Sequence, residues 1–63
     1  MNVTVNAEPR TVPDGATVAH LVEEDAKGVA VAVNEEVVPR SQWPETSLHD
    51  GDRIEILEAH QGG

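Results

Sequence analysis

The chain of 63 residues contains no cysteine. It therefore offers no disulfide, no thiolate metal site and no cysteine nucleophile. No apolar run comes near the ~20 residues that a membrane-spanning helix needs. The beginning of the chain, MNVTVNAEPR, does not have the pattern of a signal peptide. We expect a cytoplasmic protein that does not enter a membrane.

Basic residues are scarce. Four lysines and arginines stand against twelve acidic residues, which gives a net charge of -8. Such a surface repels phosphate backbones and anionic lipids, so nucleic acid and membranes are poor partners. Basic protein surfaces are better ones, although a charge of this kind also keeps a protein in solution without any partner. The three histidines, His20, His49 and His60, share no metal-ligand spacing, and we expect no metal site.

The first part of the chain predicts a strand followed by a helix. Apolar and polar residues alternate over residues 1–5, as in a half-buried strand. Residues 7–10 are predicted to be a tight connection because Pro9 cannot donate to a strand ladder, and residues 11–12 a short extended segment. A helix of about three turns then starts after Thr17, its predicted N-cap, and ends before Gly28. Its apolar stripe consists of Val18, Leu21, Val22 and Ala26.

The second part predicts three further strands. Residues 29–33, VAVAV, are apolar on both faces and suit a central, covered strand. Asn34 and Glu35 form a turn into a strand at residues 36–38, which Pro39 ends. A connection anchored by Trp43 and a turn at residues 50–52 lead to a last strand at residues 53–57. The order ββαβββ predicts a single α+β domain over residues 1–63, in which one helix covers one face of a mixed sheet and water covers the other.

Three stretches carry a resemblance to a known family. AVAVNEEVVPRSQW, DGDRIEIL and the terminal Gly-Gly are similar to the corresponding parts of the thiamine-biosynthesis sulfur carriers, the ThiS family. The similarity covers the whole chain. It implies a β-grasp, ubiquitin-like fold with a mixed sheet of about five strands.

The resemblance also implies a carrier chemistry. In it, a ThiF-type enzyme uses ATP-Mg to adenylate the carboxylate of Gly63, and sulfur from a persulfide donor replaces AMP to leave a thiocarboxylate. A ThiG-type thiazole synthase then consumes that sulfur. The chain itself would be a protein co-substrate, a monomer when free, and neither an enzyme nor the holder of a cofactor.

The residues support this independently. The chain has no phosphate-binding loop of the G-x-x-x-x-G-K-[ST] kind and no cysteine, so it can neither activate itself nor hold sulfur on a side chain. The carboxylate of Gly63 is its only plausible attachment point. Without Cβ atoms, Gly62 and Gly63 can enter a narrow cleft. We predict that residues 58–63 form a flexible tail.

Several residues are candidate partner contacts. They are Leu57, predicted to be exposed on the last strand, together with Arg40, Ala59, His60 and Gln61. Three of them have a plainer alternative: a stray surface leucine for Leu57, a structural ion pair for Arg40, and a bystander without a role in the tail chemistry for His60. Lys27, the only lysine, could accept a conjugated tail or simply end the helix in solvent.

Two other functions stay open at this point. The chain could carry sulfur for another client, as the small subunit of molybdopterin synthase or in tRNA thiolation or amino-acid synthesis. Alternatively, it could be a ubiquitin-like interaction module without covalent chemistry. Gene neighbours would distinguish the clients, and a deletion of Gly63 would distinguish a carrier from a module.

Overall fold

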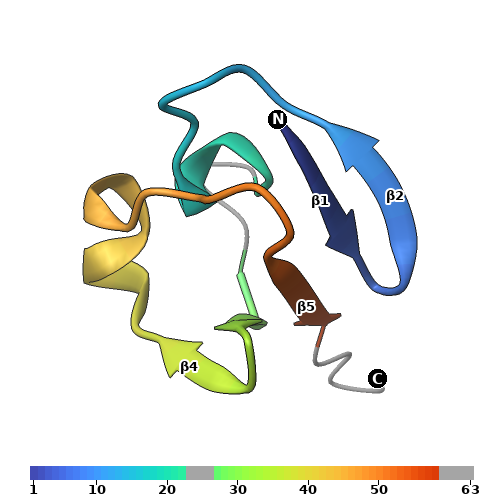
Figure 1. The fold of residues 1–63 in the computed structure, drawn as a ribbon. Coiled ribbons are helices and arrows are strands. Elements are labelled where there is room, and N and C mark those ends of the chain that lie inside the picture. The colour runs from blue at the N-terminus through green and yellow to red at the C-terminus, as the bar shows by residue number, and fades with distance from the viewer. Residues whose placement is uncertain (23–26, 59–63) are drawn as a thin grey trace.

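The fold is a five-stranded mixed sheet with short helical segments on one face (Figure 1). In this computed structural model, the structure describes residues 1–22 and 27–58. The strands are β1 (Asn2–Val5), β2 (Glu8–Thr11), β3 (Val29–Val33), β4 (Glu36–Val38) and β5 (Arg53–Glu58), and the 3-10 helices are η1 (Val18–His20) and η2 (Arg40–Glu45). Their order in the sheet is β2-β1-β5-β3-β4. The β1–β5 pair is parallel and the other pairs are antiparallel, which confirms the predicted mixed sheet.

Two hairpin turns shape the two halves of the sheet. Asn6 and Ala7 join β1 to β2 with φ angles of 51° and 69°, and Asn34 and Glu35 join β3 to β4 with φ angles of 50° and 71°. Positive φ at both central residues defines a type I′ turn, whose twist matches that of the strands. The predicted turn at Asn34-Glu35 is confirmed.

The prediction of a connection at residues 7–10 is wrong, because Pro9 lies within β2. Met1 and Val12 exchange both backbone hydrogen bonds, at 2.8 and 2.9 Å. Bonded and non-bonded pairs alternate in an antiparallel ladder, so the Thr4–Pro9 pair is a non-bonded one. The missing N–H of Pro9 therefore faces the free edge of β2 and removes no hydrogen bond.

The predicted three-turn helix is also wrong in its described part. Thr17 stands at the N-cap as expected, but η1 spans only Val18–His20 and closes with bonds from His20 N to Thr17 O and from Leu21 N to Val18 O. Residues 23–26 lie outside the described residues. The segment is short and begins with β-branched residues, so its intrinsic helix stability is low. A single turn already buries Val18 completely.

The core lies between the sheet and the two 3-10 helices. It consists of Val3, Val5, Val12, Ala16, Val18, Val31, Trp43, Leu48 and Ile54. Trp43 is 4% exposed and its Nε1 donates to Val38 O at 2.9 Å, which confirms the predicted packing role. As predicted for a sheet with one face left to water, β3 is covered on one face only: Val31 is buried, whereas Ala30 is exposed. In the described part of the chain, no helix has the length and apolar character needed to cross a membrane.

Candidate functional site

The predicted reactive end of the chain follows directly on β5. Gly62 and Gly63, and with them Ala59, His60 and Gln61, lie outside the described residues, so their predicted roles stay predictions. The description ends at Glu58, the first residue of the predicted tail, which is still part of β5. The site can therefore be built from the end of β5 and from the surface around it.

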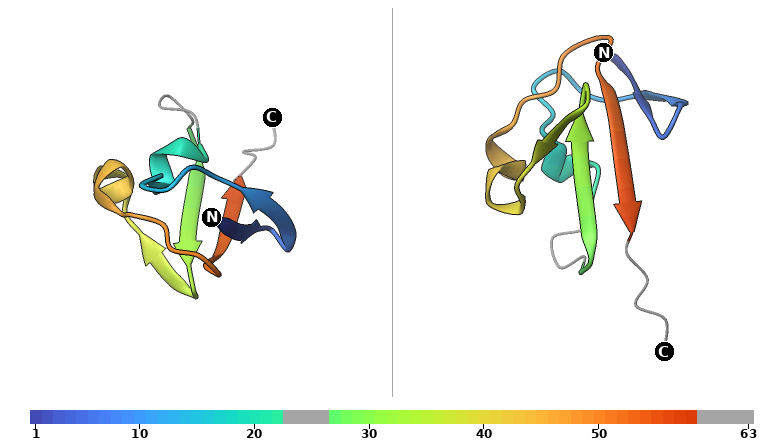
Figure 2. Two further views of the ribbon diagram at one scale, coloured as in Figure 1. Left: turned by 45° about the horizontal axis from the view of Figure 1, so that its top comes forward. Right: turned by 90° about the horizontal axis from the view of Figure 1, so that it is seen from below.

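β5 is the middle strand and carries the end of the chain to one edge of the fold. It pairs with β3 from Val33↔Ile54 to Val29↔Glu58, and with β1 only at Thr4↔Arg53 and Val5↔Ile54. Because β1 and β5 are parallel, the start of β1 and the end of β5 lie at opposite ends of the sheet (Figure 2). Glu58, the last residue that the structure describes, thus lies at the end of the sheet opposite to Met1.

An apolar patch lies on the uncovered face of the sheet, next to the end of β5. Leu57 is 66% exposed and Val37 is 75% exposed. Leu57 pairs with Ala30, and Val37 pairs with Ala32. Cross-strand partners share a face, and Ala30 and Ala32 are two residues apart, so all four side chains face the same side. We call Ala30, Ala32, Val37 and Leu57 the open-face patch.

Carboxylates border the open-face patch. Glu55 pairs with Ala32 and alternates with Leu57, so it lies on the same face. Arg53, also on this face, approaches Glu35 with 3.4 Å between Nη2 and Oε1. A partner surface that fits here would be apolar at its centre and basic at its rim.

The structure does not bring Arg40 together with Leu57. Arg40 belongs to η2, and its guanidinium carbon lies 5.2 Å from the centroid of the Trp43 ring. Its guanidinium thus makes a cation–π contact, and among residues 1–22 and 27–58 no ion pair of Arg40 is seen, while a structural ion pair with residues 23–26 lies outside the described residues. Arg40, Ser41 and Trp43 line a hollow of about 390 Å³ between η1 and η2.

The paired carboxylates of the turn at residues 50–52 serve the fold. Asp50 Oδ1 accepts from the backbone N–H of Asn2 at 2.7 Å, and Gly51 has a φ of 88°. Asp52 is 9% exposed and accepts from Asn34 Nδ2 at 3.0 Å and from the backbone N–H of His49 at 2.8 Å. The turn prediction is confirmed, and both carboxylates accept hydrogen bonds that stabilise the fold.

The side chains of Asn6 and Asn34 were not predicted from the sequence to hold β5 in place. Both grip the backbone of β5: Asn6 at Ile56, with bonds of 2.8 and 3.2 Å, and Asn34 at Arg53, with a bond of 3.0 Å. Nor was it predicted that Ala30, Ala32 and Val37 share an exposed face with Leu57. The alternation within residues 29–33 and 36–38 already contained the signal for the patch, since one of every two residues must face away from the core.

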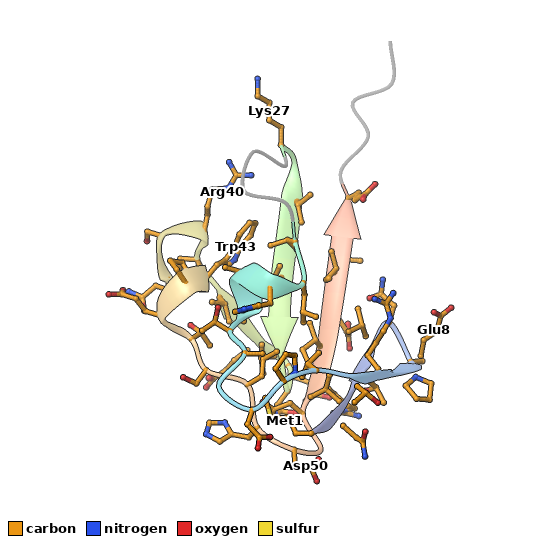
Figure 3. The ribbon with its side chains drawn as sticks, turned by 90° about the horizontal axis from the view of Figure 1, so that it is seen from above. Met1, Glu8, Lys27, Arg40, Trp43 and Asp50 are labelled. Carbon is orange, nitrogen blue, oxygen red and sulfur yellow. The ribbon has the colours of Figure 1, made fainter. Side chains whose placement is uncertain are left out.

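Lys27 is exposed and precedes β3 by two residues. Figure 3 shows it at the end of the molecule where β5 finishes, while Met1 and Asp50 lie at the opposite end. The part of the chain that is described contains no cluster of three or more His, Asp or Glu side chains able to hold a metal ion.

Comparisons with known proteins agree with this geometry. The model of the ThiS family matches residues 3–63. The sulfur carrier protein ThiS of Thermus thermophilus is 41% identical over 97% of this chain and 98% of its own length. The crystal structure of the thiamine biosynthesis protein ThiS from Geobacter metallireducens superimposes with a TM-score of 0.81, at 36% identity, over 100% of both chains, which confirms the predicted β-grasp fold.

One relative is much longer. A thiazole synthase of Paramagnetospirillum magneticum is 36% identical over 100% of this chain, which corresponds to 20% of that protein. A single polypeptide named for thiazole synthesis thus contains a segment similar to the whole of this chain.

Proposed function

The chain belongs to the ThiS family, and on that premise we propose that it is the sulfur carrier for thiazole formation in thiamine biosynthesis, with the carboxylate of Gly63 as the carrying group. The observation that carries the proposal is the match over residues 3–63, which includes both terminal glycines. A cytoplasmic location remains a prediction of the sequence.

The proposed chemistry runs on partner enzymes. A ThiF-type enzyme with ATP-Mg converts the carboxylate of Gly63 to an acyl adenylate and releases pyrophosphate. The terminal sulfur of a persulfide attacks the acyl carbon and AMP leaves, so that the carrier is joined to the donor through an acyl disulfide. A thiol reductant then attacks the donor's sulfur, forms a disulfide with it, and releases the thiocarboxylate. The chain contributes an unshielded acyl carbon, because glycine has no Cβ.

The open-face patch is the proposed docking surface for the ThiF-type enzyme. Leu57 and Val37 are the large apolar side chains that the described fold leaves exposed, and Leu57 lies one residue before the end of β5. A partner that covers this patch is therefore placed beside the segment that leaves β5. Ala59, His60 and Gln61 are proposed as further contacts of that segment.

Thiazole synthase is the proposed client. The support is the relative from Paramagnetospirillum magneticum, a protein named thiazole synthase that contains a segment similar to this chain. A carrier and its client that occur in one polypeptide act on the same sulfur atom without free diffusion between them.

Intact-protein mass spectrometry tests the proposal. The protein is incubated with a ThiF-type enzyme, ATP-Mg and a persulfide donor, and a matched sample lacks ATP. We expect a mass gain equal to the exchange of one oxygen for sulfur, located at Gly63 and absent from a Gly63 deletion. Subsequent addition of a ThiG-type synthase with its precursors should restore the original mass.

Two outcomes would contradict the proposal. Failure to form an adenylate or a thiocarboxylate with any ThiF-type enzyme would favour the non-covalent interaction module. A thiocarboxylate that the thiazole synthase does not consume would leave the carrier chemistry standing and assign it to another client, such as molybdopterin synthase, tRNA thiolation or amino-acid synthesis.

A further inference from the structure

The side chain of Asn6 takes the place of a strand residue. β1 ends at Val5, its last pairing with β5 being Val5↔Ile54, and the chain then turns away at Asn6. The backbone N–H of Asn6 still donates to Ile54 O at 2.9 Å. Beyond that point its side chain continues the ladder: Nδ2 donates to Ile56 O at 3.2 Å, and Oδ1 accepts from Ile56 N at 2.8 Å. A carboxamide has the donor and acceptor of a peptide group, so it substitutes for one.

This contact determines how the last part of β5 is held. β3 pairs with β5 along one side as far as Val29↔Glu58. On the other side, backbone pairing with β1 stops at Ile54, and at Ile56 the carboxamide of Asn6 provides the hydrogen bonds. Ile56 lies two residues before the end of β5. Without Asn6, the backbone N–H and C=O of Ile56 would lose the two hydrogen bonds that they make on the β1 side.

We propose that Asn6 is a positioning residue for the carrier reaction: its grip on Ile56 fixes the direction in which the chain leaves β5, and thereby the delivery of the carboxyl group to the activating enzyme. The inference rests on the proposed function. It separates two tasks on this strand. The open-face patch provides affinity for the partner, and Asn6 provides alignment of the reacting end, without touching it.

The fold contains a matched control in Asn34. It occupies the same position of a type I′ turn, with a φ of 50° against 51° for Asn6. Its side chain also makes two hydrogen bonds, accepting from Arg53 N at 3.0 Å and donating to Asp52 Oδ1 at 3.0 Å. These bonds hold the first residues of β5, at the end opposite to Glu58. Loss of the Asn34 side chain therefore weakens the fold but leaves the hydrogen bonds near the end of β5 intact.

Replacement by glycine isolates the side-chain contacts. Glycine accepts positive φ without strain and is favoured in type I′ turns, so Asn6→Gly and Asn34→Gly both keep the turn and lose only the carboxamide. Both variants are assayed below their melting temperatures with the ThiF-type enzyme, ATP-Mg and a persulfide donor, and kcat and KM for thiocarboxylate formation are compared with the unmodified chain. Amide hydrogen exchange at Ile56 verifies that the contact is lost.

For Asn6→Gly we expect a fall in kcat of about tenfold, well within what imprecise positioning of a reacting group costs, with KM changed by no more than about twofold. For Asn34→Gly we expect kcat and KM to stay at their original values, even where its melting temperature is the lower of the two, because Asp52 loses a partner.

Three results would overturn the inference: an unchanged kcat in Asn6→Gly, an equal loss of kcat in both variants, or a change confined to KM. In each of these the unmodified chain is still converted, so the proposed function stands. If the unmodified chain forms no adenylate and no thiocarboxylate, the proposed function fails, and the inference that depends on it is rejected as well.

Discussion

The two ends of β5 are held by similar asparagine side chains in very different surroundings. At the start of the strand, Asn34 bonds to Arg53 and to the nearly buried carboxylate of Asp52, which in turn accepts from His49. At the other end, the side chain of Asn6 bonds to the backbone of Ile56, next to the exposed side chain of Leu57. One end is a closed polar network, and the other borders solvent and an apolar patch.

The polar hydrogen-bond network and the exposed apolar side chain of this strand lie at its opposite ends. A network of partly buried hydrogen bonds stabilises a fold, because each group left without a partner would cost free energy. An exposed apolar patch adds no stability and is typical of a surface that another protein covers. We therefore propose that the start of β5 stabilises the fold and that its end contacts a partner, and the following changes test that division.

The largest effect on stability is expected for Asp52→Ala at the start of β5. The change leaves Asn34 Nδ2 and the backbone N–H of His49 without their acceptor. Hydrogen bonds to a buried charged group contribute strongly, so we expect a loss of about 3 kcal/mol in the free energy of unfolding, measured by urea denaturation. Asp50→Ala, which removes one exposed bond to Asn2, is the control and should cost about 1 kcal/mol. Equal losses in the two variants would contradict the assignment.

A smaller effect, of the opposite kind, is expected for Leu57→Asp at the end of β5. Because Leu57 is exposed, stability should change by no more than about 0.5 kcal/mol. Binding to the ThiF-type enzyme should weaken by about 2 kcal/mol, as for a central interface residue, which titration calorimetry would measure. Ser41→Asp on η2 adds the same charge away from the open-face patch and should bind normally. A normal affinity of Leu57→Asp would make this leucine an ordinary surface residue.

Val37→Asp tests whether the docking surface extends to the edge strand β4. If the open-face patch acts as one surface, this change should also weaken binding, by about 1 kcal/mol, because Val37 lies on the edge strand β4 rather than at the end of β5. An unaffected affinity would confine the docking surface to Leu57 and its neighbours on β3 and β5.

The smallest effect is expected for Arg40→Ala. The substitution removes the cation–π contact with Trp43, an exposed contact of a kind that contributes about 0.5–1 kcal/mol to stability. Binding of the ThiF-type enzyme should not change, since Arg40 lies on η2 and outside the open-face patch. Thermal unfolding and calorimetry measure the two quantities. Weakened binding at unchanged stability would make Arg40 a partner contact, as one reading of the sequence predicted.

Local patterns predicted much of the fold. Alternation identified β1 and β5, the turn residues identified the Asn34-Glu35 turn and the turn at residues 50–52, and Trp43 was recognised as a buried anchor. Position on the last strand also predicted that Leu57 is exposed. These features depend on neighbours in sequence, which is why periodicity and turn chemistry reveal them.

Other features depend on contacts between distant segments, and the sequence could not supply them. The place of Pro9 within β2 depends on which of its sides faces β1. The shortness of η1 depends on how much packing one turn can already provide to Val18. The hydrogen bonds between Asn6 and Ile56 join residues 50 positions apart, and no local pattern in the sequence predicts them.

Periodicity, turn residues and the terminal glycines were enough to predict the class of the fold, its main strands and turns, and the family resemblance. Sheet order and register, which come from the structure, place β5 in the middle of the sheet. They also bring Ala30, Ala32, Val37 and Leu57 together on the open face, and they put two asparagines at opposite ends of the same strand. The physical reason is that strand pairing is non-local: period and composition fix which residues can face a core, whereas sheet order and register decide which of them meet.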